Sequence, residues 1–359
     1  MTDDEKLGRI RAQIDKIDKE FFNLLRQRAA LATEIAKIKQ QQQTPVYYRP
    51  EREAQILRTI VANNDSLLPD REVARIFRDI MTACLALQQP LSIAYLGPEG
   101  TFTQQAVAKH FGESVNLVSE LSIPQVFRQV ESGNVHYGVV PIENSSEGMV
   151  NVTLDNLLNS EIQICGEISL RIRHHLARIA PEKPLSVIYA HQQTLSQCQY
   201  WLAMHYPKVE LKEVTSNGLA AQLASMNPES AAICGDKAVE IYKLQKSYQH
   251  IEDHPNNTTR FIILGKQLPA PSGNDKTSLI ISTPHQPGSL LQLLAPFEKH
   301  QINMTLIESR PYRHRNWSYL FFIDIEGHQS EPHIQAALNE LTSMSVMMTL
   351  LGSYPQSMG

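Results

Sequence analysis

The chain has 359 residues, which at about 150 residues per domain predicts two or three domains. Its formal net charge of −4, without a basic block, argues against a nucleic-acid partner, and no apolar run approaches the length of a membrane-spanning helix. The charged N-terminus lacks a signal peptide, so we expect a cytoplasmic protein. The four cysteines are far apart, and CxxC, HExxH, GxGxxG and P-loop motifs are missing from the sequence. We therefore expect free thiols, no metal and no cofactor.

The first forty residues predict one long amphipathic helix. Apolar residues recur at spacings of three and four from Leu7 to Ile38, and neither proline nor interior glycine interrupts the stretch from Arg9 to Thr44. At about 1.5 Å per residue this helix is roughly 50 Å long, whereas a domain of about 90 residues is only ~25–30 Å across. One end therefore needs a partner, most simply the same helix of a second chain in a homodimer or higher homo-oligomer.

Two cations interrupt the apolar stripe of this helix. Arg28 stands where the pattern asks for Leu or Ile, and Lys39 projects within ~20° of the same direction. A buried cation is costly unless it is paired. From the helix alone, the two side chains either extend to solvent or pair with acids, or they bind an anion inside a helical dimer. Arg11 points about 100° away and should serve a different pocket.

Two shorter helices follow the long one. The long helix ends at a turn around Thr44 and Pro45, because proline cannot continue a helix. A second helix begins near Glu51, and a third runs from about Asp70 to Leu87. Gln88 follows on the inward face of the third helix, where its amide needs a partner.

This arrangement resembles the all-helical chorismate mutase domain over residues 1–90. The resemblance implies six active-site residues, which are Arg11, Arg28, Lys39, Arg52, Glu53 and Gln88. It also suggests Arg49 and Cys84 as substrate contacts, at positions where the family often has an acidic residue and a serine.

The reaction that this resemblance implies is the rearrangement of chorismate, a dianion, to prephenate. It is an intramolecular [3,3] shift, so the protein has to hold a compact conformer and stabilise charge on the breaking ether oxygen. In the family's terms, Arg28 and Arg11 from a partner chain bind the carboxylates. Lys39 and Gln88 reach the ether oxygen, and Glu53 holds the ring hydroxyl.

From residue 91 short apolar runs alternate with helical patterns, which indicates an α/β fold with largely parallel strands. The span 91–266 is long for one sheet, so we expect two α/β lobes with a cleft. Polar clusters stand where strands end and helices begin, at Gly97–Thr101, Glu143–Gly148, His191–Gln193 and Ser216–Gly218. Any one of them can simply cap a helix or form a turn. Together, at the carboxyl ends of strands, they suggest a small anionic ligand.

Three motifs in order resemble prephenate dehydratase: Gly97–Phe102, Val140–Ser145 and Asn256–Phe261. The resemblance implies a two-lobed α/β fold like that of a periplasmic binding protein, with Thr259 as the key catalytic residue. Substrate contacts are expected from Thr101, Glu143, Asn144, Ser145, His191, Gln193 and Asn217. The chain departs from the family where a Ser-His-Pro-Gln motif has Ala190 and Gln192, and where a Tyr-Gly pair has Lys243.

The implied reaction removes water and CO₂ from prephenate and yields phenylpyruvate. Hydroxide is a poor leaving group, so a donor is needed near its oxygen. We expect Thr259 to donate a positioned hydrogen bond, and Glu143 could be the proton source. The sequence leaves this choice open.

After a linker at 267–275 the pattern predicts strand 277–283, helix 288–299, strands 302–309 and 317–325, helix 331–342 and strand 346–351. This β-α-β-β-α-β order is ferredoxin-like, and Trp317 opens a strand rich in aromatic and β-branched residues. The region 276–355 resembles the ACT regulatory domain. The resemblance implies a phenylalanine site at a domain–domain interface, formed by Gly288, Ser289, Glu308, Ser309 and Arg310. Alternatively, this sheet has no effector site and serves only as a dimer interface.

The whole chain thus resembles the bifunctional P-protein family, in which chorismate mutase, prephenate dehydratase and an ACT domain follow in this order. The family makes phenylpyruvate for phenylalanine biosynthesis and is inhibited by phenylalanine. The alternative is an amino-acid-sensing binding protein that has lost catalysis. Thr259 and the intact set of Arg28, Lys39 and Gln88 favour the enzyme.

Overall fold

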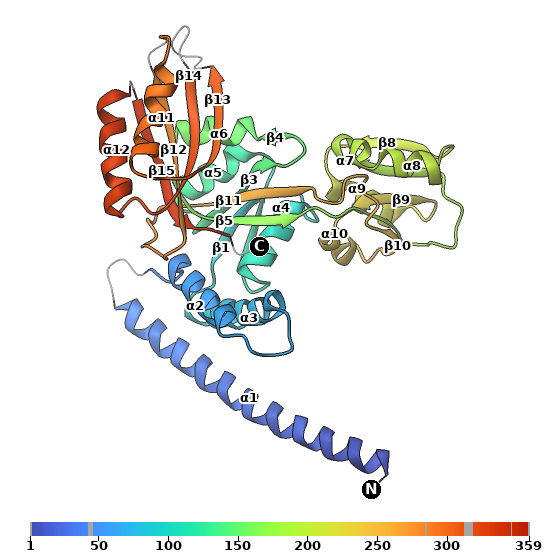
Figure 1. Cartoon of the computed structure of the whole chain (residues 1–359). Coiled ribbons are helices and arrows are strands. Elements are labelled where there is room, and N and C mark those ends of the chain that lie inside the picture. The colour runs from blue at the N-terminus through green and yellow to red at the C-terminus, as the bar shows by residue number, and fades with distance from the viewer. Residues whose placement is uncertain (1, 42–45, 284–285, 312–318, 346, 358–359) are drawn as a thin grey trace.

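The computed structural model describes residues 2–41, 46–283, 286–311, 319–345 and 347–357. A helical part comes first, a two-lobed α/β part follows, and a sheet with two helices on one face ends the chain (Figure 1). The expected multidomain class is confirmed: all-α, then two-lobed α/β, then ferredoxin-like. In the described residues no helix is both long enough and apolar enough to cross a membrane, and no group of three potential metal ligands occurs there.

The helical part consists of α1 (Asp3–Gln40), α2 (Pro50–Ala62) and α3 (Asp70–Gln88). The predicted long helix is confirmed, and a capping box between Thr2 and Glu5 begins it. The turn expected at Thr44 and Pro45 lies outside the described residues. Only Ala32 and Ala36 of α1 are buried.

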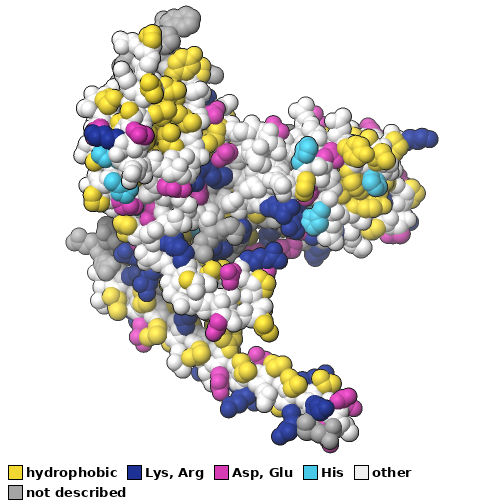
Figure 2. Space-filling view, in the orientation of Figure 1, with side chains coloured by type: hydrophobic (Ala, Val, Ile, Leu, Met, Phe, Trp, Pro, Cys, Tyr) yellow, Lys and Arg dark blue, Asp and Glu magenta, His cyan; other side chains and the backbone are white. Residues whose placement is uncertain are grey.

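The described residues leave the apolar stripe of α1 exposed. Leu7, Ile17 and Leu31 are 49%, 62% and 59% exposed, and hydrophobic groups run along the projecting helix (Figure 2). An exposed apolar face of this length is typical of an interface.

The first lobe of the α/β part holds a mixed sheet. In order across the sheet its strands are β2 (Asn116–Glu120), β1 (Ser92–Leu96), β3 (Tyr137–Asn144), β11 (Thr258–Gly265) and β5 (Gln163–Arg171), with β4 (Gly148–Met149) beside β3. The helices of this lobe are α4 (Phe102–Phe111), α5 (Ile123–Glu131) and α6 (Asn151–Leu158). Strands β1, β2 and β3 are parallel, as expected, whereas β11 is antiparallel to both of its neighbours.

The second lobe holds a five-stranded sheet with the order β10 (Gln245–Gln249), β6 (His175–Arg178), β9 (Ser230–Cys234), β7 (Val187–His191) and β8 (Glu210–Val214). Its helices are α7 (Gln192–Gln197), α8 (Gln199–His205), α9 (Asn217–Met226) and α10 (Asp236–Ile241). The chain enters this lobe after β5 and returns before β11 (Figure 1). The return explains the antiparallel strands that the simple alternation did not predict: β11 re-enters the first sheet from the opposite direction.

The C-terminal sheet has the order β13 (Met304–Pro311), β14 (Tyr319–Glu326), β12 (Asp275–Thr283) and β15 (Met347–Pro355). Helices α11 (Ser289–Lys299) and α12 (Pro332–Met344) cover one face, so the predicted ferredoxin-like order is confirmed. Trp317 and residue 346 lie outside the described residues.

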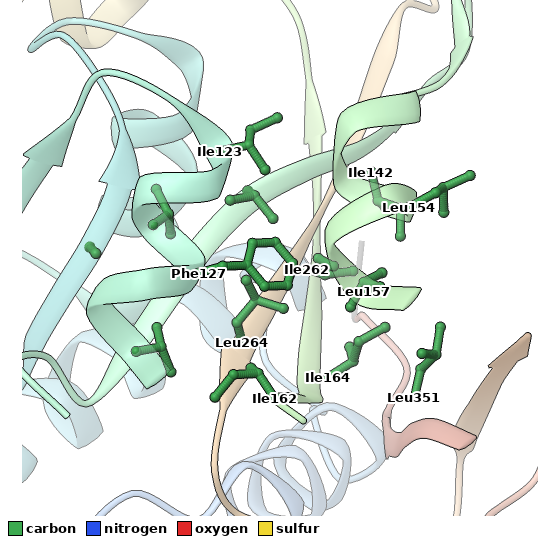
Figure 3. Packing of buried hydrophobic residues seen from close by; sticks show 14 of the residues in the cluster. Ile123, Phe127, Ile142, Leu154, Leu157, Ile162, Ile164, Ile262, Leu264 and Leu351 are labelled. Carbon is green, nitrogen blue, oxygen red and sulfur yellow. The ribbon is translucent and has the colours of Figure 1, made fainter. Parts of the chain in front are cut away.

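The other face of this sheet packs against the first lobe. Ile280, Phe322 and Leu351 belong to one buried cluster with Phe127 and Ile262 of the first lobe. Figure 3 shows Leu351 together with Phe127 and Ile262. Strand β15 runs close to β5 at Gly352, where an added Cβ would lie 2.3 Å from the carbonyl oxygen of Ile164. The C-terminal sheet is therefore part of the same core and not a loosely tethered unit.

The segment predicted as a linker is packed as well. Gln55 and Arg58 of α2 donate hydrogen bonds to the carbonyl oxygens of Pro271 and Ser272. Ser272 is buried and its N–H donates to the Asp275 carboxylate over 2.8 Å. The first helical part thus contacts the segment that leads into the last sheet.

Candidate active sites and effector region

A cavity of about 350 Å³ lies among α1, α2 and α3. It brings together six of the residues predicted from the sequence: Arg28, Lys39, Arg49, Arg52, Glu53 and Gln88. Four of them are cations and one is a carboxylate, so the cavity carries an excess of positive charge that suits a dianion. Ile35, Ile56, Met81 and Leu85 add apolar walls.

Contacts within the chain orient the cations. Arg28 Nη1 donates to the carbonyl oxygen of Ile80 over 3.3 Å, and Lys39 Nζ donates to that of Tyr47 over 3.2 Å. Burial, and then the neighbouring Arg49, lower the pKa of Lys39. The Gln88 Oε1 atom is buried and has no hydrogen-bond partner in the described part of the chain. A buried amide oxygen of this kind is typical of a group that meets a ligand.

Glu53 is the carboxylate of the cavity. Its Oε1 lies 3.6 Å from the Arg78 Nε atom. Burial raises the pKa of Glu53 to about 7, and the Arg78 charge opposes that effect. Glu53 therefore changes its protonation state close to neutral pH.

Two of the expected residues do not line this cavity. Arg11 lies on the exposed N-terminal half of α1, about 25 Å along the helix from Arg28 at 1.5 Å per residue. Cys84 is buried in α3, but Thr82 of the same helix takes part in the wall instead.

Tyr47 and Tyr48 also line the cavity, and the sequence analysis missed both. They stand immediately before Arg49, outside the helical periodicity on which the search for inward-facing residues depended. The one feature of the sequence that could have indicated them is that they directly precede three predicted site residues, Arg49, Arg52 and Glu53.

In the middle domain, the register of β3 and β11 places Asn144 opposite Thr259. Asn144 Nδ2 donates to Thr259 Oγ1 over 2.7 Å, and Thr259 is only 8% exposed. Since the Thr259 oxygen accepts this bond, its own O–H remains available as a donor. The Ser145 backbone N–H donates to the carbonyl oxygen of Thr258, which fixes the loop after β3 to β11.

Glu143 and Arg260 form an ion pair next to this Asn144–Thr259 contact. Glu143 Oε2 lies 3.2 Å from Arg260 Nε. Arg260 also contacts Glu167 of β5 and Asp324 of β14. The neighbour of Thr259 is thus connected to the C-terminal sheet.

The clusters of the second lobe are joined to one another. Asn217 Oδ1 accepts from the His191 N–H over 3.0 Å, and Asn217 Nδ2 donates to Thr194 Oγ1 over 2.8 Å. Gln193 N–H donates to His191 Nδ1, which makes His191 the N-cap of α7. Thr101 likewise caps α4. Helix capping is therefore part of what these clusters do.

Clusters from the two lobes meet at Gly218, where an added Cβ would lie 2.1 Å from the carbonyl oxygen of Glu99. Only glycine permits this approach. Of the departures from the family pattern, Ala190 is buried in β7. Lys243 has φ 53°, the left-handed region that favours glycine, which explains the Tyr-Gly pair of the family.

The residues expected to bind an effector lie at one end of the C-terminal sheet. Thr283, which ends β12, pairs with Tyr319, and Tyr319 pairs with Pro311 at the end of β13. Gly288 caps α11 in the left-handed conformation with φ 85°, and Ser289 begins that helix.

The strand residues of this set divide between the two faces of the sheet. Ser309 lies opposite Phe321, which packs under the helices, whereas Glu308 lies opposite Phe322, which packs against the first lobe. Arg310 faces that lobe too, and its Nη1 lies 2.9 Å from the Asp155 carboxylate of α6. Two of the five residues are therefore placed at the contact with the middle domain.

Comparison with known proteins matches each part of the chain to a family. The family model for chorismate mutase type II covers residues 10–89, that for prephenate dehydratase covers residues 93–268, and that for the ACT domain covers residues 277–342. The bifunctional chorismate mutase/prephenate dehydratase of Pseudomonas aeruginosa is 47% identical over 363 residues, which cover 99% of this chain and 100% of the relative. The Neisseria gonorrhoeae protein of the same name is 45% identical and covers 99% and 98%.

A solved structure resembles the last two parts. The prephenate dehydratase of Arthrobacter aurescens, in complex with L-Phe, has a TM-score of 0.68 and 29% identity, and the match covers 74% of this chain and 90% of that one.

Proposed function

The chain belongs to the bifunctional chorismate mutase/prephenate dehydratase family, and we propose how its residues divide the two reactions. Residues 1–90 rearrange chorismate to prephenate, residues 91–266 convert prephenate to phenylpyruvate, and residues 276–355 bind phenylalanine as a feedback inhibitor. The observation that carries the proposal is the cavity in which Arg28, Lys39 and Gln88 meet.

In the mutase cavity the cations bind the two carboxylates of chorismate and favour its compact conformer. Lys39 and the Gln88 amide reach the ether oxygen, where negative charge develops as the C–O bond breaks. The Glu53 carboxylate accepts a hydrogen bond from the ring hydroxyl. The Gln88 Nε2 group is the donor to the ether oxygen, and the burial of its amide, whose Oε1 has no partner among the described residues, supports contact with a ligand. The burial and the neighbouring cation that lower the pKa of Lys39 support the same role for Lys39.

Arg11 completes the cavity of a second chain in this proposal. It lies too far along α1 to reach the cavity of its own chain, and the exposed stripe of α1 provides an apolar surface for a homodimer. In that arrangement each α1 would bury its stripe on the partner and deliver its Arg11 to the partner's cavity.

In the dehydratase domain Thr259 donates a hydrogen bond to the hydroxyl group that leaves prephenate. The Asn144 amide supports this role, because it orients the Thr259 oxygen by donating to it. Thr101 and Ser145 of the first lobe and His191, Gln193 and Asn217 of the second lobe bind the substrate between them. Glu143 is a candidate proton source, although its contact with Arg260 engages the carboxylate in an ion pair.

A cytoplasmic enzyme of phenylalanine biosynthesis fits this assignment. The test is a turnover assay in which chorismate is supplied and phenylpyruvate is followed, with and without phenylalanine. We expect turnover of chorismate and of separately supplied prephenate, and inhibition of the second reaction by phenylalanine. An amino-acid-sensing binding protein that has lost catalysis would bind an amino acid and turn over neither substrate.

A further inference from the structure

Tyr48 is shared between the two catalytic domains. It lines the mutase cavity and is only 3% exposed. Its ring packs in the buried cluster of the first dehydratase lobe, 5.3 Å from the Phe111 ring and 5.4 Å from the Tyr137 ring. Residues 46–49, which lead into α2, are thus anchored in the neighbouring domain.

The Tyr48 hydroxyl makes a hydrogen bond with His110 of α4, with Oη and Nε2 2.5 Å apart. Burial, with Arg78 and Lys109 nearby, lowers the pKa of His110 to about 3, and burial raises the pKa of the Tyr48 phenol. The His110 imidazole and the Tyr48 phenol are therefore both uncharged near neutral pH, and the hydrogen bond between them joins two neutral groups.

The end of α4 also contacts the cavity wall at a second point. An added Cβ at Gly112 would lie 2.8 Å from Thr82 Oγ1, and Thr82 lines the cavity. Leu85, another wall residue, packs against the same buried cluster as Tyr48. Three wall residues from two separate segments, Tyr48, Thr82 and Leu85, thus rest on the dehydratase lobe.

What Tyr48 holds in place is the most polar part of the cavity. The Tyr47 carbonyl oxygen accepts the hydrogen bond of Lys39, and Arg49, Arg52 and Glu53 follow within five residues of Tyr48. Fixing Tyr48 therefore fixes the start of α2 and the Lys39 side chain together.

We propose that His110 of the dehydratase domain is a positioning residue for the mutase reaction: it fixes Tyr48 and, through it, the polar wall of the mutase cavity. This inference rests on the proposed assignment of that cavity to chorismate. It implies that mutase activity depends on a contact with the domain that performs the second reaction, even though His110 itself does not touch the substrate.

The test uses the full-length chain with two variants that each remove the hydrogen bond, Tyr48→Phe and His110→Leu. Mutase activity is measured as disappearance of chorismate and dehydratase activity on supplied prephenate. We expect mutase kcat/KM to fall roughly tenfold to a hundredfold in both variants, because small displacements of positioning groups have effects of this size. Dehydratase activity stays at the wild-type level. The double variant is no worse than either single one, since both remove the same contact.

Two controls separate positioning from a general loss of structure. His110→Gln keeps a side-chain partner for Tyr48 and should restore much of the mutase activity. His205→Leu alters an exposed histidine of the second lobe that bonds to its own helix, and should change neither activity.

Unchanged mutase kinetics in folded Tyr48→Phe and His110→Leu would overturn the inference, and so would a parallel loss of both activities without rescue by His110→Gln. If wild-type protein did not consume chorismate at all, the assignment of the cavity would fail instead, so the two failures are distinguishable.

Discussion

Arg260 Nη1 lies 2.5 Å from Asp324 Oδ2, so the residue after Thr259 is bonded directly to the C-terminal sheet. Asp324 is fully buried in β14, and its other oxygen accepts from Ser278 of β12. Arg260 also contacts Glu143 and Glu167 in the middle domain. A buried charge that loses one partner is left uncompensated, which is costly. Arg260 therefore gives a direct contact path between the ACT domain and the strand that carries Thr259.

If this contact transmits inhibition, Asp324→Asn should weaken it. We expect a higher phenylalanine concentration for half-inhibition of dehydratase activity, with phenylalanine binding retained in calorimetry, because the variant alters the coupling and not the effector site. The unfolding free energy should fall by about 2 kcal/mol. Glu326→Gln, at an exposed position of the same strand, is the matched control. Wild-type sensitivity to phenylalanine in Asp324→Asn would rule out this path.

Arg28→Ala and Lys39→Ala should each lower mutase kcat/KM by about 100-fold or more, because both remove charge that faces the substrate dianion. Dehydratase activity on supplied prephenate should persist, since both residues lie in the helical domain. Lys37→Ala removes an exposed cation of the same helix outside the cavity and serves as the control. Loss of both activities in well-folded variants would argue against separate sites.

Arg11 is expected to act in the cavity of the neighbouring chain. Arg11→Ala and Arg28→Ala subunits, each inactive as a mutase alone, should regain activity on mixing. In a mixed dimer one cavity carries both changes and the other carries neither. Random exchange of equal amounts makes about half of the dimers mixed, so about a quarter of all cavities are intact.

Exchange of subunits is verified first with labelled chains. No recovery after complete exchange would place Arg11 in the cavity of its own chain or outside the mutase reaction.

Glu53 should give the mutase reaction a pH dependence near neutrality. Its pKa of about 7 means that the side chain is protonated below that pH and becomes a full carboxylate acceptor above it. Mutase kcat/KM should therefore rise as pH increases through about 7 and then level off. Glu53→Gln has no titratable group at this position, so its activity should be lower and should not rise with pH near 7. A pH profile that is the same in both proteins would assign the rise to another group.

Thr259→Ala should lower dehydratase kcat by about 100-fold or more, because the donor to the leaving hydroxyl is lost. Prephenate binding should survive, since the polar clusters of both lobes remain. Thr259→Ser keeps the hydroxyl and should retain much of the activity. Both outcomes are measured by turnover and by calorimetric titration of prephenate. Full activity in Thr259→Ala would remove Thr259 from the mechanism.

The sequence by itself determined the long helix and its exposed stripe, because the periodicity of apolar residues records which side of a helix avoids water. It also singled out Arg28 and Lys39, since each breaks that periodicity in the same direction. Motif order was enough to place the three parts of the chain and to select Thr259 as a candidate.

Only the tertiary structure decided which distant segments meet. Periodicity describes the faces of one element and carries no information about the element on which that face packs. Tyr48 and His110 are 62 positions apart and share no pattern, and Arg260 meets Asp324 only because β11 returns to the first sheet and the C-terminal sheet packs on it. Both contacts join residues of different domains. Local sequence does not record how domains pack against one another, so neither contact could be predicted from it.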